Sequence, residues 1–187
     1  MDETRGPVVV TVQAIVTPGV TVTREDPGTE AAARLIDELS EALESITGAS
    51  GRASSDPASL RGEGACFVLA RDGTGTPVGC GGFRAFDDAP QVVEIKRMYA
   101  RAGTRGVGAA VLAALEREAI AQGAREAWLE TRRVNARAVG FYERQGYVVI
   151  PNYGRYAGRE DAVCLGKSLP AAGASSGRTS SSDGARG

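Results

Sequence analysis

The sequence contains no histidine among its 187 residues. This absence excludes Ser-His-Asp and Cys-His nucleophilic sites, histidine-ligated metal sites and the most common general base. Any catalysis must therefore rely on carboxylates, tyrosines, water and backbone N–H groups.

Cysteine is nearly as scarce. Cys66, Cys80 and Cys164 are odd in number and lie far apart, without C-x-x-C spacing. They therefore indicate neither a disulfide framework nor a zinc site, and we expect no metal. We expect all three to be small buried apolar side chains.

The sequence also lacks an excess of positive charge and any long apolar run. Its net charge is −1 with 24% charged residues, and lysine occurs only at positions 96 and 167, every other basic residue being arginine. We therefore expect no nucleic-acid partner. No apolar run is long enough to span a bilayer, and the N-terminus has no signal-peptide pattern, so we expect a cytoplasmic protein without membrane contact.

The length and the 42% hydrophobic content suit one domain with a single core. We expect residues 1–7 to be a loose N-terminus and residues 8–169 to form the domain. Beyond Pro170 the chain is rich in Ser, Gly and Ala, so residues 170–187 are expected to be a disordered tail.

The first half of the domain shows strand, helix and hairpin patterns. Residues Val8–Val16 are rich in Val, Ile and Thr and predict a strand. Asp26 is predicted to cap a helix that has Pro27 at its first position and ends near Gly48. A polar loop is expected at 49–64, followed by an antiparallel hairpin of Cys66–Ala70 and Pro77–Phe86.

The second half alternates strands and helices. A strand that contains Glu94 precedes a helical stripe that runs from Gly108 to about Gly123. Residues 127–131 form the next strand, which should lie parallel to the Glu94 strand because a helix connects the two. The remaining expected elements are a helix from Asn135 to Gly146 and strands at 148–151 and 162–169.

The segment Arg105–Ala110 joins the Glu94 strand to the next helix, with glycines at 103, 106 and 108. Small residues let a ligand approach the backbone, and the first N–H groups of a helix lack partners, so the segment is typical of an anion site. It has neither the Gly-Lys-Ser/Thr ending of a P-loop nor the G-x-G-x-x-G of a dinucleotide site. Plain close packing is the alternative explanation for these glycines.

Two separated motifs narrow these alternatives. Arg105, Gly108 and Ala110 fit the pattern Arg/Gln-x-x-Gly-x-Gly/Ala. Asn135 and Tyr142 fit N-x-x-A-x-x-x-Y, with Ala138 between them, and Glu-Arg-Gln-Gly-Tyr follows up to position 147. In this order and spacing the motifs resemble those of the GNAT (Gcn5-related N-acetyltransferase) superfamily. The resemblance covers about Val8–Leu169.

The resemblance implies an α/β (α+β) fold with a single GNAT-like domain. Its sheet is expected to be mixed and mostly antiparallel, with a splayed parallel pair of central strands and helices on both faces. The implied activity is transfer of an acetyl group from acetyl-CoA, as cosubstrate, to a primary amine by direct attack in a ternary complex. A small molecule such as an amino acid or amine metabolite is the expected acceptor, and the protein is expected to be a monomer or homodimer.

The resemblance also assigns roles to residues. Strand backbone at 98–100 and the loop are expected to bind the pantetheine arm and the pyrophosphate, and Asn135 is expected to bind the pantetheine or to be a plain helix cap. The expected cofactor-binding residues are Met98, Tyr99, Ala100, Arg105, Gly106, Val107, Gly108, Ala109, Ala110, Asn135 and Tyr142.

Two residues are expected to carry the chemistry. An alkyl ammonium has a pKa of about 10.4 and must lose a proton before it attacks. Glu94 resembles the base of the histone-acetylating branch of the family, although it could instead order water or bind the substrate ammonium. Tyr142 resembles the general acid that protonates the leaving thiolate, with core packing as the alternative.

The acceptor side is less defined by the sequence. Arg84, Glu94, Tyr153 and Arg155 are candidate substrate residues, although the arginines could simply lie at the surface. A strongly polycationic acceptor is disfavoured because the sequence has no evident acidic run. Three other functions stay open: a protein or peptide N-acetyltransferase, a non-catalytic CoA-binding module of the same fold, and a mononucleotide-binding α/β domain.

Overall fold

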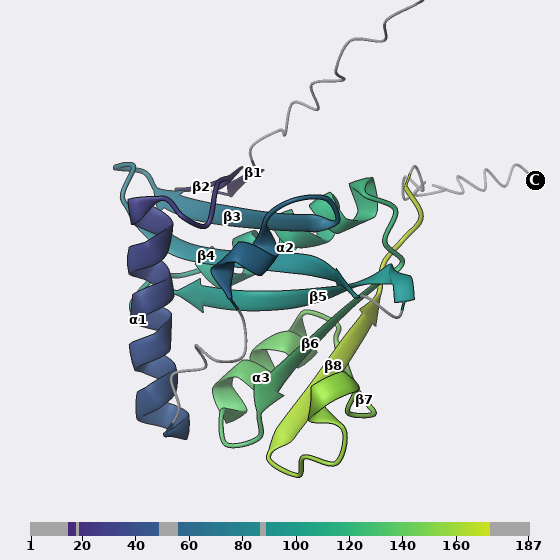
Figure 1. The fold of residues 1–187 in the computed structure, drawn as a ribbon. Coiled ribbons are helices and arrows are strands. Elements are labelled where there is room, and N and C mark those ends of the chain that lie inside the picture. Colours follow the sequence, from purple (N-terminus) through teal and green to yellow (C-terminus); the bar gives the residue numbers. More distant parts are fainter. Residues whose placement is uncertain (1–14, 18, 49–55, 87–88, 173–187) are drawn as a thin grey trace, which may run out of the picture.

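A computed structural model describes residues 15–17, 19–48, 56–86 and 89–172. They form a mixed sheet in the order β1-β2-β3-β4-β5-β6-β8-β7, in which β5 and β6 are parallel and all other neighbours are antiparallel (Figure 1). The strands are β1 (Ile15–Thr17), β2 (Val20–Arg24), β3 (Ala65–Asp72), β4 (Pro77–Phe86), β5 (Ala89–Ala100), β6 (Glu126–Arg132), β7 (Val148–Ile150) and β8 (Ala162–Ser168).

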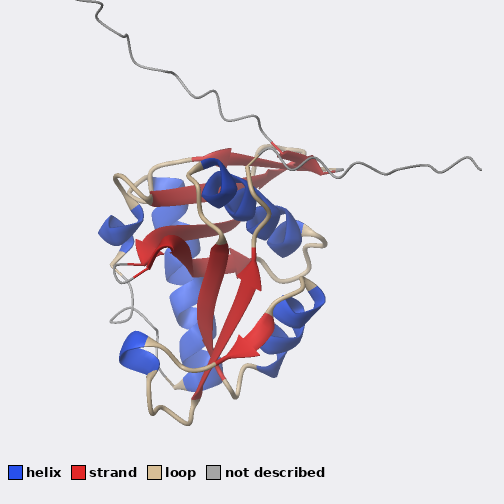
Figure 2. Cartoon of the chain, turned by 90° about the vertical axis from the view of Figure 1, so that its right-hand side faces the viewer, coloured by secondary structure: helices blue, strands red, loops and turns tan. Residues whose placement is uncertain are grey.

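Helices cover both faces of the sheet (Figure 2). The α-helices are α1 (Glu30–Thr47), α2 (Val107–Ala121) and α3 (Ala136–Arg144), and the short 3-10 helices are η2 (Pro57–Leu60) and η3 (Gly154–Tyr156). Helix α1 lies on one face, whereas α2 and α3 lie on the other. No helix in the described ranges is both long and apolar enough to cross a membrane.

Strand β3 shows how the sequence builds a core on each face. Phe67 and Leu69 pack with Leu35 of α1, whereas Val68 and Ala70 belong to the core that contains Leu115 of α2. This alternation has the period of two that places successive strand residues on opposite faces. The expected fold class, a single α/β domain with a mixed sheet, is confirmed.

The predicted start of the first helix is wrong. Its N-cap is Thr29, whose hydroxyl accepts a hydrogen bond from the N–H of Ala32. The carboxylate of Asp26 is engaged elsewhere, because it accepts from the N–H of Gly28 and pairs with the guanidinium of Arg61 at 2.6 Å. Asp26 therefore shapes the turn before the helix. The predicted end is confirmed, since Gly48 caps the helix in the left-handed region.

Other expectations are met in part. The predicted hairpin is β3 and β4, and all three cysteines are buried as expected. Strand β2 and η2 were not predicted, η2 lying within the expected polar loop. Of the strand predicted at 8–16, only 15–16 are described and lie in β1; residues 1–7, 49–55 and 173–187 also lie outside the described residues.

The parallel pair separates after three residues, as expected for splayed central strands. Its register is Val92 with Glu126, Val93 with Ala127, and Glu94 with Trp128. Beyond these pairs β5 continues to Ala100 and β6 to Arg132 without pairing to each other. The facing backbone edges of the two strands are therefore available to a ligand.

A β-bulge accompanies this separation. The register between β4 and β5 shifts where Cys80 opposes Tyr99 and Gly82 opposes Lys96, and Arg97 has φ 55°. A non-glycine residue in the left-handed region is uncommon, and a bulge bends the strand that carries it. The bend in β5 lies directly after its last pair with β6.

Glycines in β4 bring α2 close to the sheet. A Cβ atom on Gly81 would lie 2.6 Å from the sulfur of Met98 and 2.9 Å from Cγ1 of Val111 in α2. A Cβ on Gly79 would clash with Val107, the first residue of α2, and lie 2.9 Å from the carbonyl oxygen of Tyr99, so the start of α2 lies over the end of β5.

Candidate active site

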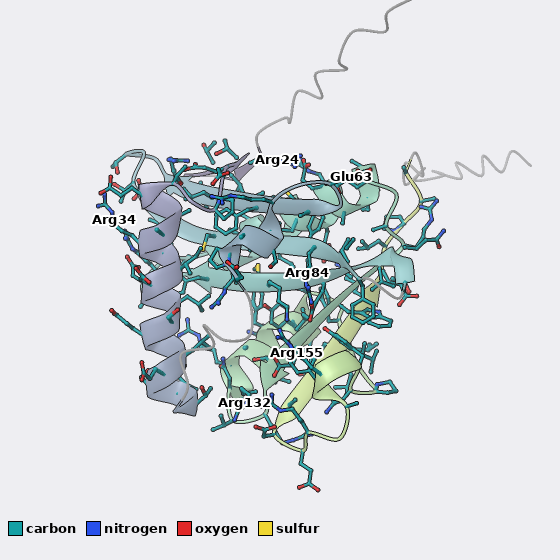
Figure 3. The ribbon with its side chains drawn as sticks, in the orientation of Figure 1. Arg24, Arg34, Glu63, Arg84, Arg132 and Arg155 are labelled. Carbon is teal, nitrogen blue, oxygen red and sulfur yellow. The ribbon has the colours of Figure 1, made fainter. Side chains whose placement is uncertain are left out.

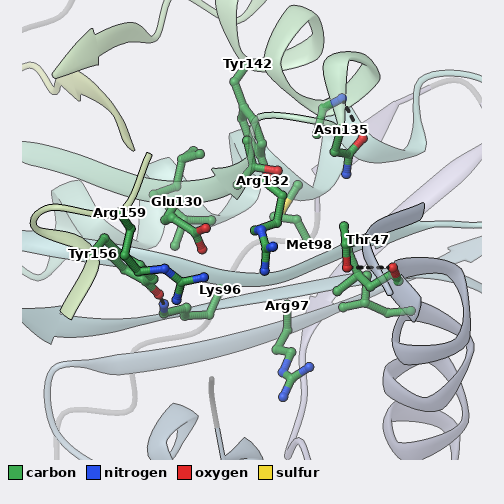
Figure 4. A pocket seen from close by; sticks show the side chains of 16 residues that line it. Thr47, Lys96, Arg97, Met98, Glu130, Arg132, Asn135, Tyr142, Tyr156 and Arg159 are labelled. Atoms are coloured by element: carbon green, nitrogen blue, oxygen red, sulfur yellow. Dashed lines mark hydrogen bonds between the residues drawn. The ribbon is translucent and has the colours of Figure 1, made fainter. Parts of the chain in front are cut away.

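A cavity of about 220 Å³ lies where β5 and β6 separate (Figure 4). Five parts of the chain contribute side chains to it. They are Leu39, Leu43 and Thr47 of α1; Ile95, Lys96, Arg97 and Met98 of β5; Leu129, Glu130, Thr131 and Arg132 of β6; Asn135, Ala138 and Tyr142 at α3; and Tyr156 and Arg159 before β8.

Tyr142 presents a hydroxyl to this cavity. Its ring is buried and packs against Phe141 and Tyr147, with centroids 5.1 and 5.7 Å away. The hydroxyl has no hydrogen-bond partner among the described residues. Burial raises the pKa of Tyr142 above its usual value of 10. The side chain therefore holds a proton at neutral pH and can donate it into the cavity.

Asn135 combines two tasks. Its Oδ1 accepts a hydrogen bond from the N–H of Ala138 at 3.2 Å and so caps α3. Its amide nitrogen points into the cavity, away from that cap (Figure 4). The two explanations given for this residue, helix cap and ligand donor, are therefore compatible.

The loop before α2 has the features of an anion site. Gly106 is the N-cap with φ 73°, no side chain caps the helix, and its first turn has no acidic residue. The first N–H groups of the helix are therefore open to an anion, and the helix dipole favours one. Arg105 is exposed beside them. Residues 105–110 do not belong to the cavity wall.

The predicted strand residues divide between the two faces. The Met98 side chain lines the cavity. Tyr99 instead packs against the core on the α1 side and does not line the cavity. Ala100 packs with the core under α2.

Glu94 is held in a buried ion-pair cluster. It is 1% exposed, and its two oxygens lie 2.7 Å from Lys96 Nζ and 2.9 Å from Arg84 Nη2. Tyr153 donates a third contact at 3.3 Å. Burial alone would raise the pKa of Glu94, but the two cations outweigh it and hold that pKa below the usual 4.5. Glu94 is not part of the cavity wall.

Glu130 is the carboxylate that does line the cavity, and sequence reasoning missed it. No hydrogen bond or salt bridge engages its carboxylate within the described part of the chain. Burial raises the pKa of Glu130 even though Lys96, Arg132, Arg155 and Arg159 act against that rise. The alternation of buried Ala127 and Leu129 places Glu130 on the opposite face of β6, but it does not identify the cavity, because Leu129 also lines it.

The predicted substrate residues lie outside the cavity wall. Arg84 pairs with Glu94, Tyr153 stacks in an aromatic group with Trp128, and Arg155 donates to the hydroxyl of Tyr156 at 3.2 Å. Figure 3 shows Arg84 and Arg155 near the centre of the view, to the right of α1. None of the three belongs to the lining residues.

No group of three or more Cys, Asp or Glu side chains that could hold a metal ion occurs within the described ranges. The described residues that line the cavity provide the hydroxyls of Tyr142 and Tyr156, the Glu130 carboxylate and several cationic side chains.

Comparisons with known proteins agree with this arrangement. The sequence profile of the acetyltransferase (GNAT) family matches residues 32–147, more than half of the chain. The chain is 34% identical over 141 residues to a protein named IAA acetyltransferase from Azospirillum brasilense. The aligned region is 74% of this chain and 91% of that relative.

Solved structures share the fold. An acetyltransferase from Streptococcus agalactiae superposes with a TM-score of 0.68 at 17% identity, over 82% of this chain and 100% of that one. A GNAT-family acetyltransferase from Staphylococcus aureus gives a TM-score of 0.65 at 16% identity, over 81% and 99%. The family profile, the curated relative and the splayed strand pair lead to one conclusion: this chain belongs to the acetyltransferase (GNAT) family.

Proposed function

We propose that the protein is an N-acetyltransferase that moves the acetyl group of acetyl-CoA to a primary amine of a small molecule. One observation carries the proposal: the cavity between the splayed strands contains both a free tyrosine hydroxyl and a free carboxylate, Tyr142 and Glu130. An acid and a base on one cavity are what acyl transfer to an amine requires.

The cofactor is proposed to lie along the open edge of β5. Its amide-bearing arm would pair with backbone groups of 98–100 as an added strand does, and the Asn135 amide nitrogen would bind it from α3. The pyrophosphate would contact the N–H groups of residues 105–110 at the uncapped start of α2. A backbone N–H of β5 would polarise the thioester carbonyl.

The reaction then balances with the residues present. The amine nitrogen attacks the thioester carbonyl carbon, an N–C bond forms and the C–S bond breaks. Glu130 accepts one proton from the ammonium before the attack. Tyr142 gives a proton to the departing thiolate and is reprotonated by the second proton that the nitrogen loses as the amide forms. The products are an amide and the free thiol of CoA.

Glu94 as the base stays a prediction. Its oxygens are engaged by Arg84 and Lys96, so it would act only through another group or after losing a partner. Glu130 faces the cavity directly and has no such partner, which supports Glu130 as the proton acceptor and Glu94 as the residue that positions Lys96.

The size of the cavity supports a small acceptor. A volume of about 220 Å³, walled by α1 and by the residues before β8, must hold the acetyl end of the cofactor as well as the amine. The name of the A. brasilense relative, IAA acetyltransferase, supports acetyl transfer but leaves the acceptor of this chain a proposal.

Release of free thiol from acetyl-CoA in the presence of an amine library tests the proposal. Turnover with at least one small amine is expected, and thermal stability should rise with acetyl-CoA but not with ATP or NAD. A ligand at 100 times its Kd adds about 2.7 kcal/mol of stability. Stabilisation without any turnover would favour a non-catalytic CoA-binding module instead.

A further inference from the structure

We propose, resting on the proposed function, that the acceptor is a zwitterion: an amine with a carboxylate nearby, as in an α-amino acid. The amine would face Glu130 and Tyr142, and the carboxylate would face the cationic side of the cavity, formed by Lys96, Arg132 and Arg159. These three residues would then determine specificity.

The charges on the cavity wall are unequal. Among the described residues that line it, Lys96, Arg97, Arg132 and Arg159 are cationic and Glu130 is anionic. A wall of this kind attracts an acceptor that carries negative charge and disfavours a polyamine, which would add cations to it.

Internal ion pairs leave part of this positive charge uncompensated. Asp161 is shared by two guanidiniums, since its Oδ2 lies 2.7 Å from Arg132 and 3.1 Å from Arg159. One carboxylate therefore faces two cations. The Nε atom of Arg132 is buried and has no hydrogen-bond partner within the described ranges. That atom is closed to a ligand, but the Arg132 and Arg159 side chains are 31% and 43% exposed, so other parts of the two guanidiniums are open to a ligand carboxylate.

Lys96 extends the cationic side toward β5. Its ammonium donates to the hydroxyl of Tyr156 at 2.6 Å and pairs with Glu94 at 2.7 Å. These contacts fix the ammonium at the edge of the cavity, with Tyr156 beside Arg159. Figure 4 shows Glu130 between this group and Arg132.

The arrangement separates the two ends of a zwitterion. Glu130 is the one anionic side chain among the described lining residues and would contact the ammonium. Lys96, Arg132 and Arg159 line the same cavity and would contact the carboxylate. An amine without a carboxylate would meet those cations with no compensating charge. A site built for a charged group discriminates strongly against the analogue that lacks it.

Matched acceptors test this directly. Thiol release would be measured with leucine, its amide and its decarboxylated amine, and with the same three forms of phenylalanine and methionine. We expect kcat/KM for at least one acid to exceed that of its amide and its amine by about 100-fold. An amide or decarboxylated amine used as well as the acid would overturn the proposal.

Two variants identify the carboxylate contacts. Arg132→Met and Arg159→Met should each lower kcat/KM for the acid by about 10-fold or more while leaving that of the amide nearly unchanged. Arg133→Met is the matched control, because Arg133 is an exposed neighbour outside the cavity wall. Equal losses on acid and amide would mean that the arginines only support the fold, which contradicts the proposal.

Failure of the proposed function has a different signature. If the wild type releases no thiol with any amine, the acetyltransferase assignment fails. Calorimetric binding of the same acceptors, in the presence of CoA, then decides whether the site prefers a zwitterion. Tighter binding of the acid supports the zwitterion site, and equal binding of acid and amide overturns it.

Discussion

Tyr142 combines a packed ring with a free hydroxyl, so one atom can be removed without disturbing the rest. Tyr142→Phe should keep the contacts with Phe141 and Tyr147 and most of the acetyl-CoA affinity, but kcat should fall by about 10²–10⁴ because the proton donor is lost. Tyr147→Phe is the control, since that hydroxyl bonds Glu116 outside the cavity. Near wild-type kcat in Tyr142→Phe, with chemistry rate-limiting, would return Tyr142 to a packing role.

Removing the charge of Glu94 and removing that of Glu130 should change the free energy of unfolding in opposite directions. The pKa of Glu94 lies below 4.5, so its ion pairs stabilise the fold above that pH and the stabilisation is lost as pH falls further. Glu94→Gln leaves buried Lys96 without its carboxylate and should lower the free energy of unfolding by about 3 kcal/mol at pH 7. The exposed Glu143→Gln serves as control.

Glu130→Gln should raise the free energy of unfolding at neutral pH. The pKa of Glu130 is raised, so its ionised form destabilises the fold at neutral pH and the penalty disappears as pH falls below the unfolded value near 4.5. The variant should melt higher than wild type at pH 7.5 and equally at pH 4. Its kcat/KM should fall most at low pH and recover as the amine loses its own proton. A loss of equal size at every pH would argue against a base.

At the scale of elements, the approach of α2 to β4 depends on missing Cβ atoms. Gly81→Ala would place a methyl group within 3.0 Å of Met98, Val111 and Leu115 and should lower the free energy of unfolding by about 1–3 kcal/mol. Gly73→Ala is the control, because a Cβ there meets nothing within 4 Å. Urea unfolding measures both. Equal stability of the two variants would show that the helix can shift without loss.

The start of α2 can be tested as an anion site in the same way. A Cβ on Gly108 would lie 3.5 Å from the Phe141 ring, an ordinary contact, so Gly108→Val should fold. Its branched side chain would cover the first N–H groups and reduce acetyl-CoA affinity at least 10-fold. Ala121→Val, at the exposed end of the same helix, tests the general effect of a branched residue. Unchanged acetyl-CoA affinity in a folded Gly108→Val variant would exclude this loop as the anion site.

At the scale of the whole molecule, features that depend on residues close in sequence were predicted correctly, whereas contacts between residues far apart in sequence were not. The sequence was enough to predict the β3–β4 hairpin and the parallel β5–β6 pair. It was also enough to predict the starts of α2 and α3 from the motifs at 105–110 and at Asn135, because each depends on neighbours in sequence. Asp26 was misread as a cap because Arg61, 35 residues away, engages its carboxylate. The grouping of Glu130 with Arg159 required the fold, since β8 returns beside β6 only in three dimensions.

The short parallel ladder has one further consequence. In Figure 1, β3, β4 and β5 run across the molecule while β6 and β8 run diagonally. Among the described residues, the two half-sheets pair only at 92–94 and 126–128. A ligand that pairs with β5 would lengthen this junction. Amide hydrogen exchange at 95–100 should therefore slow when acetyl-CoA binds, whereas exchange in the β3–β4 hairpin should not change.

Three residue pairs join the two half-sheets, few enough for the junction to act as a hinge. Occupancy of the gap would set the angle between the half-sheet that carries α1 and the one that carries Tyr156 and Arg159, so the cofactor would tune the width of the acceptor site from within the sheet.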